Sequence, residues 1–279
     1  MSTSYRKALF VDNLRRDQIL EQYSQGRRSD GRGFSDYRTL NIQVGTMIKA
    51  NGSATVDLGD TRVVAGVKVA VGTPFPDTPD EGLLMVGAEV LPIASAFAEP
   101  GPPDEDSIEL ARVVDRGVRE SHMVDMHEMV IEEGKKVYSV FVDVAIVNVD
   151  GNLLDATSYA VVSALASAKY KKMTLKEDQV VELEEMASLP VQTIPVSITT
   201  SKVADFLLID PTVEEEAIQE ARITFAIADG QVCAAQKGGQ GSFSPQQILK
   251  ALDGALLKSK EIEARIREVV GSAKEGSGP

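Results

Sequence analysis

The chain has 279 residues, of which 43% are hydrophobic and 25% are charged. This composition is typical of a globular protein with one large or two medium domains, and no apolar run approaches the roughly 18 residues of a membrane span. With 42 acidic against 29 basic residues, the net charge of −13 argues against a protein whose whole surface binds nucleic acid, but it does not exclude a local basic site.

The start of the chain, MSTSYRKALFVDNLRRDQ, is polar and lacks the apolar segment of a secretory signal. The only cysteine, Cys233, has no second cysteine with which to form an internal disulfide. Both features favour a reducing cytoplasmic location. The apolar neighbours of Cys233 predict a small buried side chain.

Changes in hydrophobic period define the elements of the first half. Strict alternation in SATVDL and again from Val63 to Val69 predicts a hairpin that turns at Gly59-Asp60. The elements expected are a helix over 6–25 ended by Gly26, a polar loop over 27–38, hairpin strands over 53–58 and 63–69, a loop over 71–82, a strand over 83–93, a loop over 99–106, a helix over 107–121, a strand over 137–151 and a buried helix over 156–169.

The helix expected over 107–121 carries a basic stripe. Arg112, Arg116 and Arg119 lie at i, i+4 and i+7, within about 60° of one another around the helix. The apolar side chains fit the opposite flank, so the arginines can face outward; these apolar residues are Ile108, Ala111, Val114 and Val118. Two interpretations of the stripe stay open: an anion site, or exposed ion pairs. The pairs would be Asp115–Arg119, Arg116–Glu120 and Glu109–Arg112.

The second half repeats the strand pattern after a charged connection. KKMTLKEDQVVELEEMAS over 171–188 lacks a clear period and is expected to link the two halves. Strands are expected near 193–199, 205–210, 222–228 and 231–236, with a turn at Asp229-Gly230, followed by a helix from Ser244-Pro245 to near Val270 and a disordered tail. The fold class expected is α+β, with helices on mixed sheets.

Other candidate sites have plain structural interpretations. His122 and His127 are five residues apart and have no cysteine partner, so they do not form a zinc pattern. The glycine-rich KGGQGSF over 237–243 fits a tight loop better than a phosphate loop. The acidic stretch over 210–221 could hold Mg²⁺, but a solvated acidic face is favoured. No cofactor fingerprint occurs, so no cofactor and no metal are expected.

Five segments together resemble the ribonuclease PH family, and within it the non-catalytic RNase-PH-like subunits of the archaeal exosome. They are RRSDGRGFSDYR, GSATVDLGDTRVVAGVKV, PFPDTPDEG, EPGPPDEDSIELARVVDRGVRES and VDVAIVNVDGNLLDA. The resemblance implies an RNase PH-like (ribosomal protein S5 domain 2-like) fold with two subdomains. The expected division is an N-terminal helix and linker over 1–30, a first domain over 31–170, a linker over 171–189, a second domain over 190–260, and the helix end with the disordered tail over 261–279.

Active members of the family shorten RNA from its 3′ end with inorganic phosphate, but this chain departs from their pattern. Where they carry a glycine-rich phosphate-binding stretch with an arginine, this chain has Asn152, Leu153, Leu154 and Asp155. A carboxylate there would repel phosphate. Where they carry an acid twelve residues after a strand-end aspartate such as Asp210, this chain has Arg222, which cannot protonate a leaving group.

The resemblance therefore implies a non-catalytic subunit. Its expected partners are a catalytic RNase-PH-like subunit, in three pairs that close a hexameric ring, and RNA-binding cap subunits. Single-stranded RNA is expected to bind at Arg112, Arg116 and Arg119. Two alternatives stay open: an active phosphate-dependent 3′–5′ exoribonuclease, and a purely structural ring scaffold.

Overall fold

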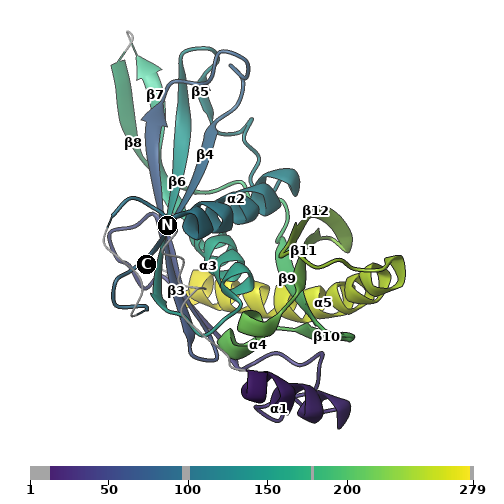
Figure 1. The fold of residues 1–279 in the computed structure, drawn as a ribbon. Coiled ribbons are helices and arrows are strands. Elements are labelled where there is room, and N and C mark those ends of the chain that lie inside the picture. The colour runs from purple at the N-terminus through teal and green to yellow at the C-terminus, as the bar shows by residue number, and fades with distance from the viewer. Residues whose placement is uncertain (1–12, 96–100, 177–178, 277–279) are drawn as a thin grey trace.

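The computed structural model describes residues 13–95, 101–176 and 179–276 (Figure 1). The helices described are α1 (Asn13–Ser24), α2 (Glu105–Glu120), α3 (Leu153–Ser167), α4 (Val213–Ile218) and α5 (Pro245–Gly276). The strands described are β1 (Leu40–Val44), β2 (Gly52–Leu58), β3 (Thr61–Gly72), β4 (Leu83–Val90), β5 (Val130–Glu132), β6 (Lys136–Asn148), β7 (Lys169–Lys176), β8 (Gln179–Ser188), β9 (Val196–Val203), β10 (Phe206–Ile209), β11 (Ala221–Ala228) and β12 (Gln231–Gly238).

The first half forms a mixed sheet in the order β1-β2-β3-β6-β4, with β5 added beside β6. Alternating burial along β2 and β3 gives the sheet one face that packs on the core, and Gly59 turns between the two strands at φ +57°. This confirms the predicted hairpin. β4 runs parallel to β6, so the chain must cross over between them, and α2 lies in that crossover.

The second half forms an antiparallel sheet in the order β10-β9-β11-β12. The four predicted strands are confirmed. Asp229 at φ +49° and Gly230 at φ +75° form the predicted hairpin turn between β11 and β12. Every residue of β11 is buried, because α2 and α5 both pack on this sheet.

The predicted buried helix is confirmed as α3, which begins at Leu153 rather than at residue 156. It contacts β2 and β3 of the first sheet, β9 of the second sheet, and both α2 and α5. Figure 1 shows α3 at the centre of the molecule, between the two sheets. Its small side chains allow this close packing on both sides.

Several element boundaries differ from the expectations. The segment over 171–188, which was expected to link the two halves, is not irregular: β7 and β8 pair into an antiparallel hairpin (Figure 1), and β7 contacts β5. The alternation was hidden because Lys171–Glu182 and Lys172–Glu185 pair across exposed faces at 3.1 and 2.6 Å.

The two chain ends also differ in part. The N-terminal helix is described from Asn13, and Gly26 follows it in the left-handed region at φ +78°, whereas residues 6–12 lie outside the described part. The C-terminal helix continues past Val270 to Gly276, so the expected disorder is wrong for 272–276. Residues 277–279 lie outside the described part. None of the described helices is long and apolar enough to cross a membrane.

Candidate nucleic-acid interface

The arginine stripe lies on α2, a helix with strong local signals. Asp104 caps it by accepting a 2.9 Å hydrogen bond from the Ser107 amide, and two acidic residues in the first turn complement the helix dipole. Leu110, Val114 and Val118 are buried on one side. Arg112, Arg116 and Arg119 are exposed, which confirms that they face outward.

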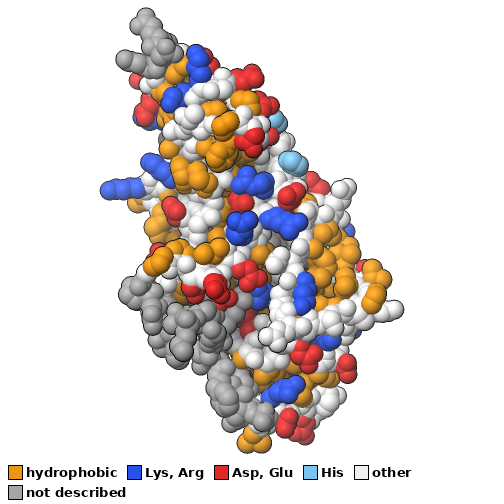
Figure 2. Space-filling model, turned by 45° about the horizontal axis from the view of Figure 1, so that its top comes forward, with side chains coloured by type: hydrophobic (Ala, Val, Ile, Leu, Met, Phe, Trp, Pro, Cys, Tyr) orange, Lys and Arg blue, Asp and Glu red, His pale blue; other side chains and the backbone are white. Residues whose placement is uncertain are grey.

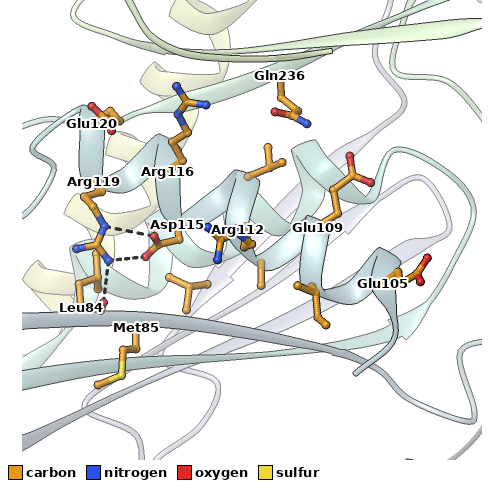
Figure 3. A pocket seen from close by; sticks show the side chains of 14 residues that line it. Leu84, Met85, Glu105, Glu109, Arg112, Asp115, Arg116, Arg119, Glu120 and Gln236 are labelled. Carbon is orange, nitrogen blue, oxygen red and sulfur yellow. Dashed lines mark hydrogen bonds and ion pairs between the residues drawn. The ribbon is translucent and has the colours of Figure 1, made fainter. Parts of the chain in front are cut away.

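One residue of the predicted apolar flank is misplaced. Ile108 is 50% exposed, whereas Leu110, which was not among the predicted apolar residues, is buried. Ile108 instead lines an open groove of about 810 Å³ between α2 and β4, together with all three arginines (Figure 3). The groove therefore offers both cationic and apolar side chains to a ligand.

The three arginines are not equivalent. Arg119 donates from Nη2 to Asp115 Oδ1 and to the Leu84 carbonyl oxygen, each at 2.9 Å (Figure 3). Within the described residues, Arg112 and Arg116 make no hydrogen bond or ion pair. Of the three ion pairs that the alternative interpretation required, only Asp115–Arg119 is therefore formed.

Glu109, which the ion-pair interpretation matched with Arg112, pairs instead with an arginine of the second sheet. Its Oε1 accepts a 2.6 Å hydrogen bond from Nη2 of Arg222 on β11. Arg222 is 6% exposed, and its Nε is buried with no partner among the described residues. Arg222, which the sequence analysis expects at the position of an acid in active relatives, thus binds α2 through Glu109.

Figure 2 shows how the charges are distributed over one face of the molecule. Lys and Arg side chains gather near the middle of this face, in the region where Figure 1 places α2, and acidic and apolar side chains lie around them. A local basic site on an acidic chain is therefore present at the surface.

The stretch from Asn152 to Asp155 is closed to solvent. Asn152 is 1% exposed and Asp155 is fully buried, and the two leucines between them are also buried. Burial raises the pKa of Asp155 to about 6, although the hydrogen bonds from Tyr37, Asn152 and Thr199 favour its ionised form. The expected repulsion of phosphate by Asp155 is therefore secondary, because no anion reaches this position without a rearrangement.

The acidic stretch over 210–221 is only in part a solvated face: the prediction is wrong for the buried Asp210 and Glu215, whereas Glu214 and Glu216 are half-buried and Glu220 is exposed. Asp210 is fully buried and bound by Arg38 Nη2 at 2.7 Å and by Arg32 Nη1 at 2.8 Å. Burial alone would raise the pKa of Asp210, but the hydrogen bonds and charge of Arg38 outweigh it and hold the pKa below its usual value.

Glu215 in the same stretch is 2% exposed. Nε of Arg28 donates to its Oε1 at 2.8 Å, as does the Tyr23 hydroxyl. Sequence analysis missed this cluster, and its one signal was the run of arginines in the segment over 27–38, which is a loop as predicted. Among the described residues, no group of histidine, cysteine, aspartate and glutamate side chains could hold a metal ion.

The remaining candidates have structural roles. The glycine-rich segment is a tight turn between β12 and α5, as favoured: Gly239 has φ +80°, and a Cβ there would lie 2.7 Å from the Glu220 carbonyl oxygen. Cys233 is only half-buried, because it lies on the edge strand β12, so its predicted burial is wrong. His127 is exposed, and its hydrogen bond to the Asp80 backbone raises its pKa.

Comparison with known proteins agrees with this arrangement. The chain matches the 3′ exoribonuclease family, domain 1 over residues 36–171 and domain 2 over residues 193–256. It is 44% identical over 263 residues to the exosome complex component Rrp42 of Thermococcus gammatolerans, covering 93% of this chain and 96% of that one.

Solved structures show the same likeness. A chain in the Archaeoglobus fulgidus exosome with RNA bound to the active site superimposes with a TM-score of 0.83 at 41% identity, covering 91% of this chain and 98% of that chain. A chain of an archaeal exosome core gives a TM-score of 0.80 at 40% identity, covering 91% and 97%. The fold, the family match and these relatives together show that the chain belongs to the 3′ exoribonuclease family, with the RNase PH-like fold.

Proposed function

We propose that this chain is the non-catalytic subunit of an exosome, a complex that degrades RNA from the 3′ end by phosphorolysis. In it the chain pairs with a catalytic RNase-PH-like subunit and binds single-stranded RNA through Arg112 and Arg116. The observation that carries this proposal is the pair of exposed arginines in the groove, neither bonded to any described residue, on a chain of net charge −13.

The physical argument starts from the guanidinium groups. Each presents a planar fork of donors that matches two phosphate oxygens. A free fork loses no intramolecular partner when it binds phosphate, whereas a paired one must first give that partner up. Because most of the surface repels RNA, the strand is concentrated where Arg112 and Arg116 offset the repulsion.

The role is one of positioning. Holding the 3′ end of RNA in a fixed place beside a partner's active site speeds the partner's reaction without any bond being broken by this chain. The non-catalytic assignment is supported by Arg222, which stays charged, and by the buried stretch from Asn152 to Asp155. A cytoplasmic ring of three such pairs, with RNA-binding cap subunits, is part of the same proposal.

The test measures phosphate-dependent shortening of a labelled single-stranded RNA by the chain alone, and by the chain assembled with its catalytic relative. We expect activity only in the mixture. Replacement of Arg112 and Arg116 by alanine should leave assembly intact and weaken RNA binding. The salt dependence should flatten by roughly 0.7 in log–log slope for each RNA phosphate that the variant no longer binds.

A matched control removes two arginines elsewhere. Arg265 and Arg267 are half-exposed on α5 and pair with glutamates of the same helix, so their replacement by alanine makes the same change in net charge. Unchanged RNA affinity in the groove variant would favour a structural scaffold. Phosphate-dependent shortening by the chain alone would favour an active exoribonuclease.

A further inference from the structure

The groove contains carboxylates as well as arginines. Glu105, Glu109, Asp115 and Glu120 all line it beside the three arginines. Glu109 is the critical one, because it lies three residues before Arg112 and therefore on the same side of α2. An unbalanced carboxylate at this point would reduce the potential that draws phosphate to Arg112.

A buried arginine offsets the negative charge of Glu109. Arg222 reaches it from β11 in the second sheet, with 2.6 Å between Nη2 and Oε1. The Glu109 side chain is 32% exposed, whereas that of Arg222 is 8% exposed. The carboxylate thus lies at the floor of the groove, and the cation that neutralises it lies beneath that floor.

The position is shaped to hold this guanidinium. Arg222 is opposite Gly238 in the pairing of β11 with β12. A Cβ at Gly238 would lie 2.9 Å from both Cζ and Nε of Arg222, so a larger residue there would push the guanidinium away from its present position. The buried Nε has no hydrogen-bond partner among the described residues. The contact with Glu109 must offset the free-energy cost of burying this unpaired donor.

The two ends of α2 are fixed in different ways. Near its start, Glu109 joins it to the second sheet through Arg222; near its end, Arg119 joins it to β4 through the Leu84 carbonyl oxygen. Arg112 and Arg116 lie between these two anchors. Their direction into the groove therefore depends on contacts with both sheets.

We infer that Arg222 is a positioning residue of the RNA-binding groove: by binding Glu109, it neutralises that carboxylate beside Arg112 and holds α2 against the second sheet. This inference rests on the proposed function, since it assumes that the groove binds RNA phosphates. Arg222 touches no RNA itself, because it is covered by the groove floor.

The test uses the chain assembled with its catalytic relative, in buffer without phosphate so that the RNA is not degraded. The affinity for a labelled single-stranded oligoadenylate is measured for the wild type and for Arg222→Met, Glu109→Gln and the double variant. Arg222→Met should weaken binding about three- to tenfold, because it removes the cation that offsets the charge of Glu109 beside Arg112. Adding Glu109→Gln should restore the affinity to within about twofold of the wild type, since the charge to be neutralised is then gone.

The rescue separates an electrostatic role from mere packing. If Arg222→Met and the double variant bind RNA equally weakly, or if Arg222→Met binds as the wild type does, the inference is wrong. If Arg222→Met fails to assemble, Arg222→Lys and Glu109→Gln decide the question. Arg222→Lys keeps a cation beside Glu109, and Glu109→Gln removes the carboxylate, so both variants should bind RNA at least about as well as the wild type. A loss of RNA affinity in either variant overturns the inference.

A variant with Arg112 and Arg116 replaced by alanine is measured in the same series. If it binds RNA as tightly as the wild type, the proposed function itself fails. If it binds weakly while the effect of Arg222→Met is absent, only the role of Arg222 is disproved.

Discussion

Nη2 of Arg119 donates a 2.9 Å hydrogen bond to the carbonyl oxygen of Leu84, and this contact joins the last turn of α2 to the edge strand β4. The same nitrogen also binds Asp115. Arg119 therefore differs from Arg112 and Arg116, because its guanidinium is already hydrogen-bonded within the protein. Position on a helix face alone could not reveal this difference.

Replacing Arg119 by alanine should accordingly affect stability more than RNA binding. The loss of a hydrogen bond from a charged donor should lower the free energy of unfolding by about 1 kcal/mol, whereas RNA affinity should fall less than it does in Arg112→Ala. Thermal unfolding and RNA binding of the assembled complex measure the two effects. A variant that keeps its stability but binds RNA as weakly as Arg112→Ala would contradict this assignment.

The buried pair between Arg28 and Glu215 is expected to be the costliest contact to break. Arg28→Met leaves an uncompensated carboxylate in a site that is 2% exposed, and the free energy of unfolding should fall by about 3–5 kcal/mol. The control is Arg15→Met, which removes an ion pair to Glu214 whose side chains are 40% and 38% exposed, and should cost under about 1 kcal/mol. Equal losses in urea unfolding would show that burial does not govern these pairs.

These pairs mark the limit of what the sequence could predict. The hairpin at Gly59 and the amphipathic α2 follow from neighbours in the chain, so local period and turn chemistry predict them. Arg28 and Glu215 are separated by 187 residues, and Arg222 and Glu109 by 113. No local pattern encodes such a pairing. The family resemblance implies that Arg222 stands in place of an acid, but only the structure shows what the arginine binds.

A second limit concerns strands whose two-residue period is interrupted. In the segment that forms β7 and β8, the register shifts between Lys171 and Met173, so the apolar Tyr170 and Met173, which pack on the core, do not alternate regularly, and charged pairs such as Lys172–Glu185 occupy exposed positions. Period analysis therefore gives no signal for a strand there, and the segment resembles an irregular link. Cross-strand ion pairs can be read only once the partner strand is known.

Gly151 is a position where close approach and backbone conformation both require glycine. It has φ +82°, and a Cβ would lie 2.6 Å from the Pro211 carbonyl oxygen. Gly151→Ala should lower the free energy of unfolding by about 2 kcal/mol or more. Gly134 is the matched control, since it has φ +71° but no atom within 4 Å of its Cβ position, so Gly134→Ala carries only the conformational cost. Denaturant unfolding that gives equal losses would exclude a steric contribution at Gly151.

Asp155 is a buried carboxylate whose network tolerates an amide. Its Oδ2 accepts from the Tyr37 hydroxyl at 2.6 Å, the Asn152 amide at 2.9 Å and the Thr199 amide at 3.1 Å, while Oδ1 accepts from the Thr199 hydroxyl at 2.7 Å. In Asp155→Asn the amide oxygen can keep the first three bonds. The new NH₂ can donate to the Thr199 hydroxyl, which is then free to donate to Thr224, 2.8 Å away.

The pH dependence of stability follows from the direction in which burial shifts the pKa of Asp155. Burial raises the pKa of Asp155 to about 6 in the folded protein, against 3.8 for the ordinary side chain. Between these two values the folded state holds a proton that the unfolded chain has lost, so this group makes the protein less stable as pH rises from about 4 to about 6, by on the order of 3 kcal/mol in all. Above pH 6 its contribution is constant.

Asp155→Asn should therefore remove this loss. We expect the free energy of unfolding of the variant, relative to the wild type, to increase as pH rises from 4.5 to about 6 and to level off above it; urea unfolding at several pH values measures it. Other groups that titrate in this range are common to both proteins, so their contributions cancel in the difference. Asp155→Leu is the control, because it removes the charge and also leaves the surrounding donors unpaired, so it should be destabilised at every pH. A difference between Asp155→Asn and the wild type that does not change with pH would mean that the carboxyl group keeps its ordinary pKa, because the hydrogen bonds from Tyr37 and Thr199 then balance the effect of its burial.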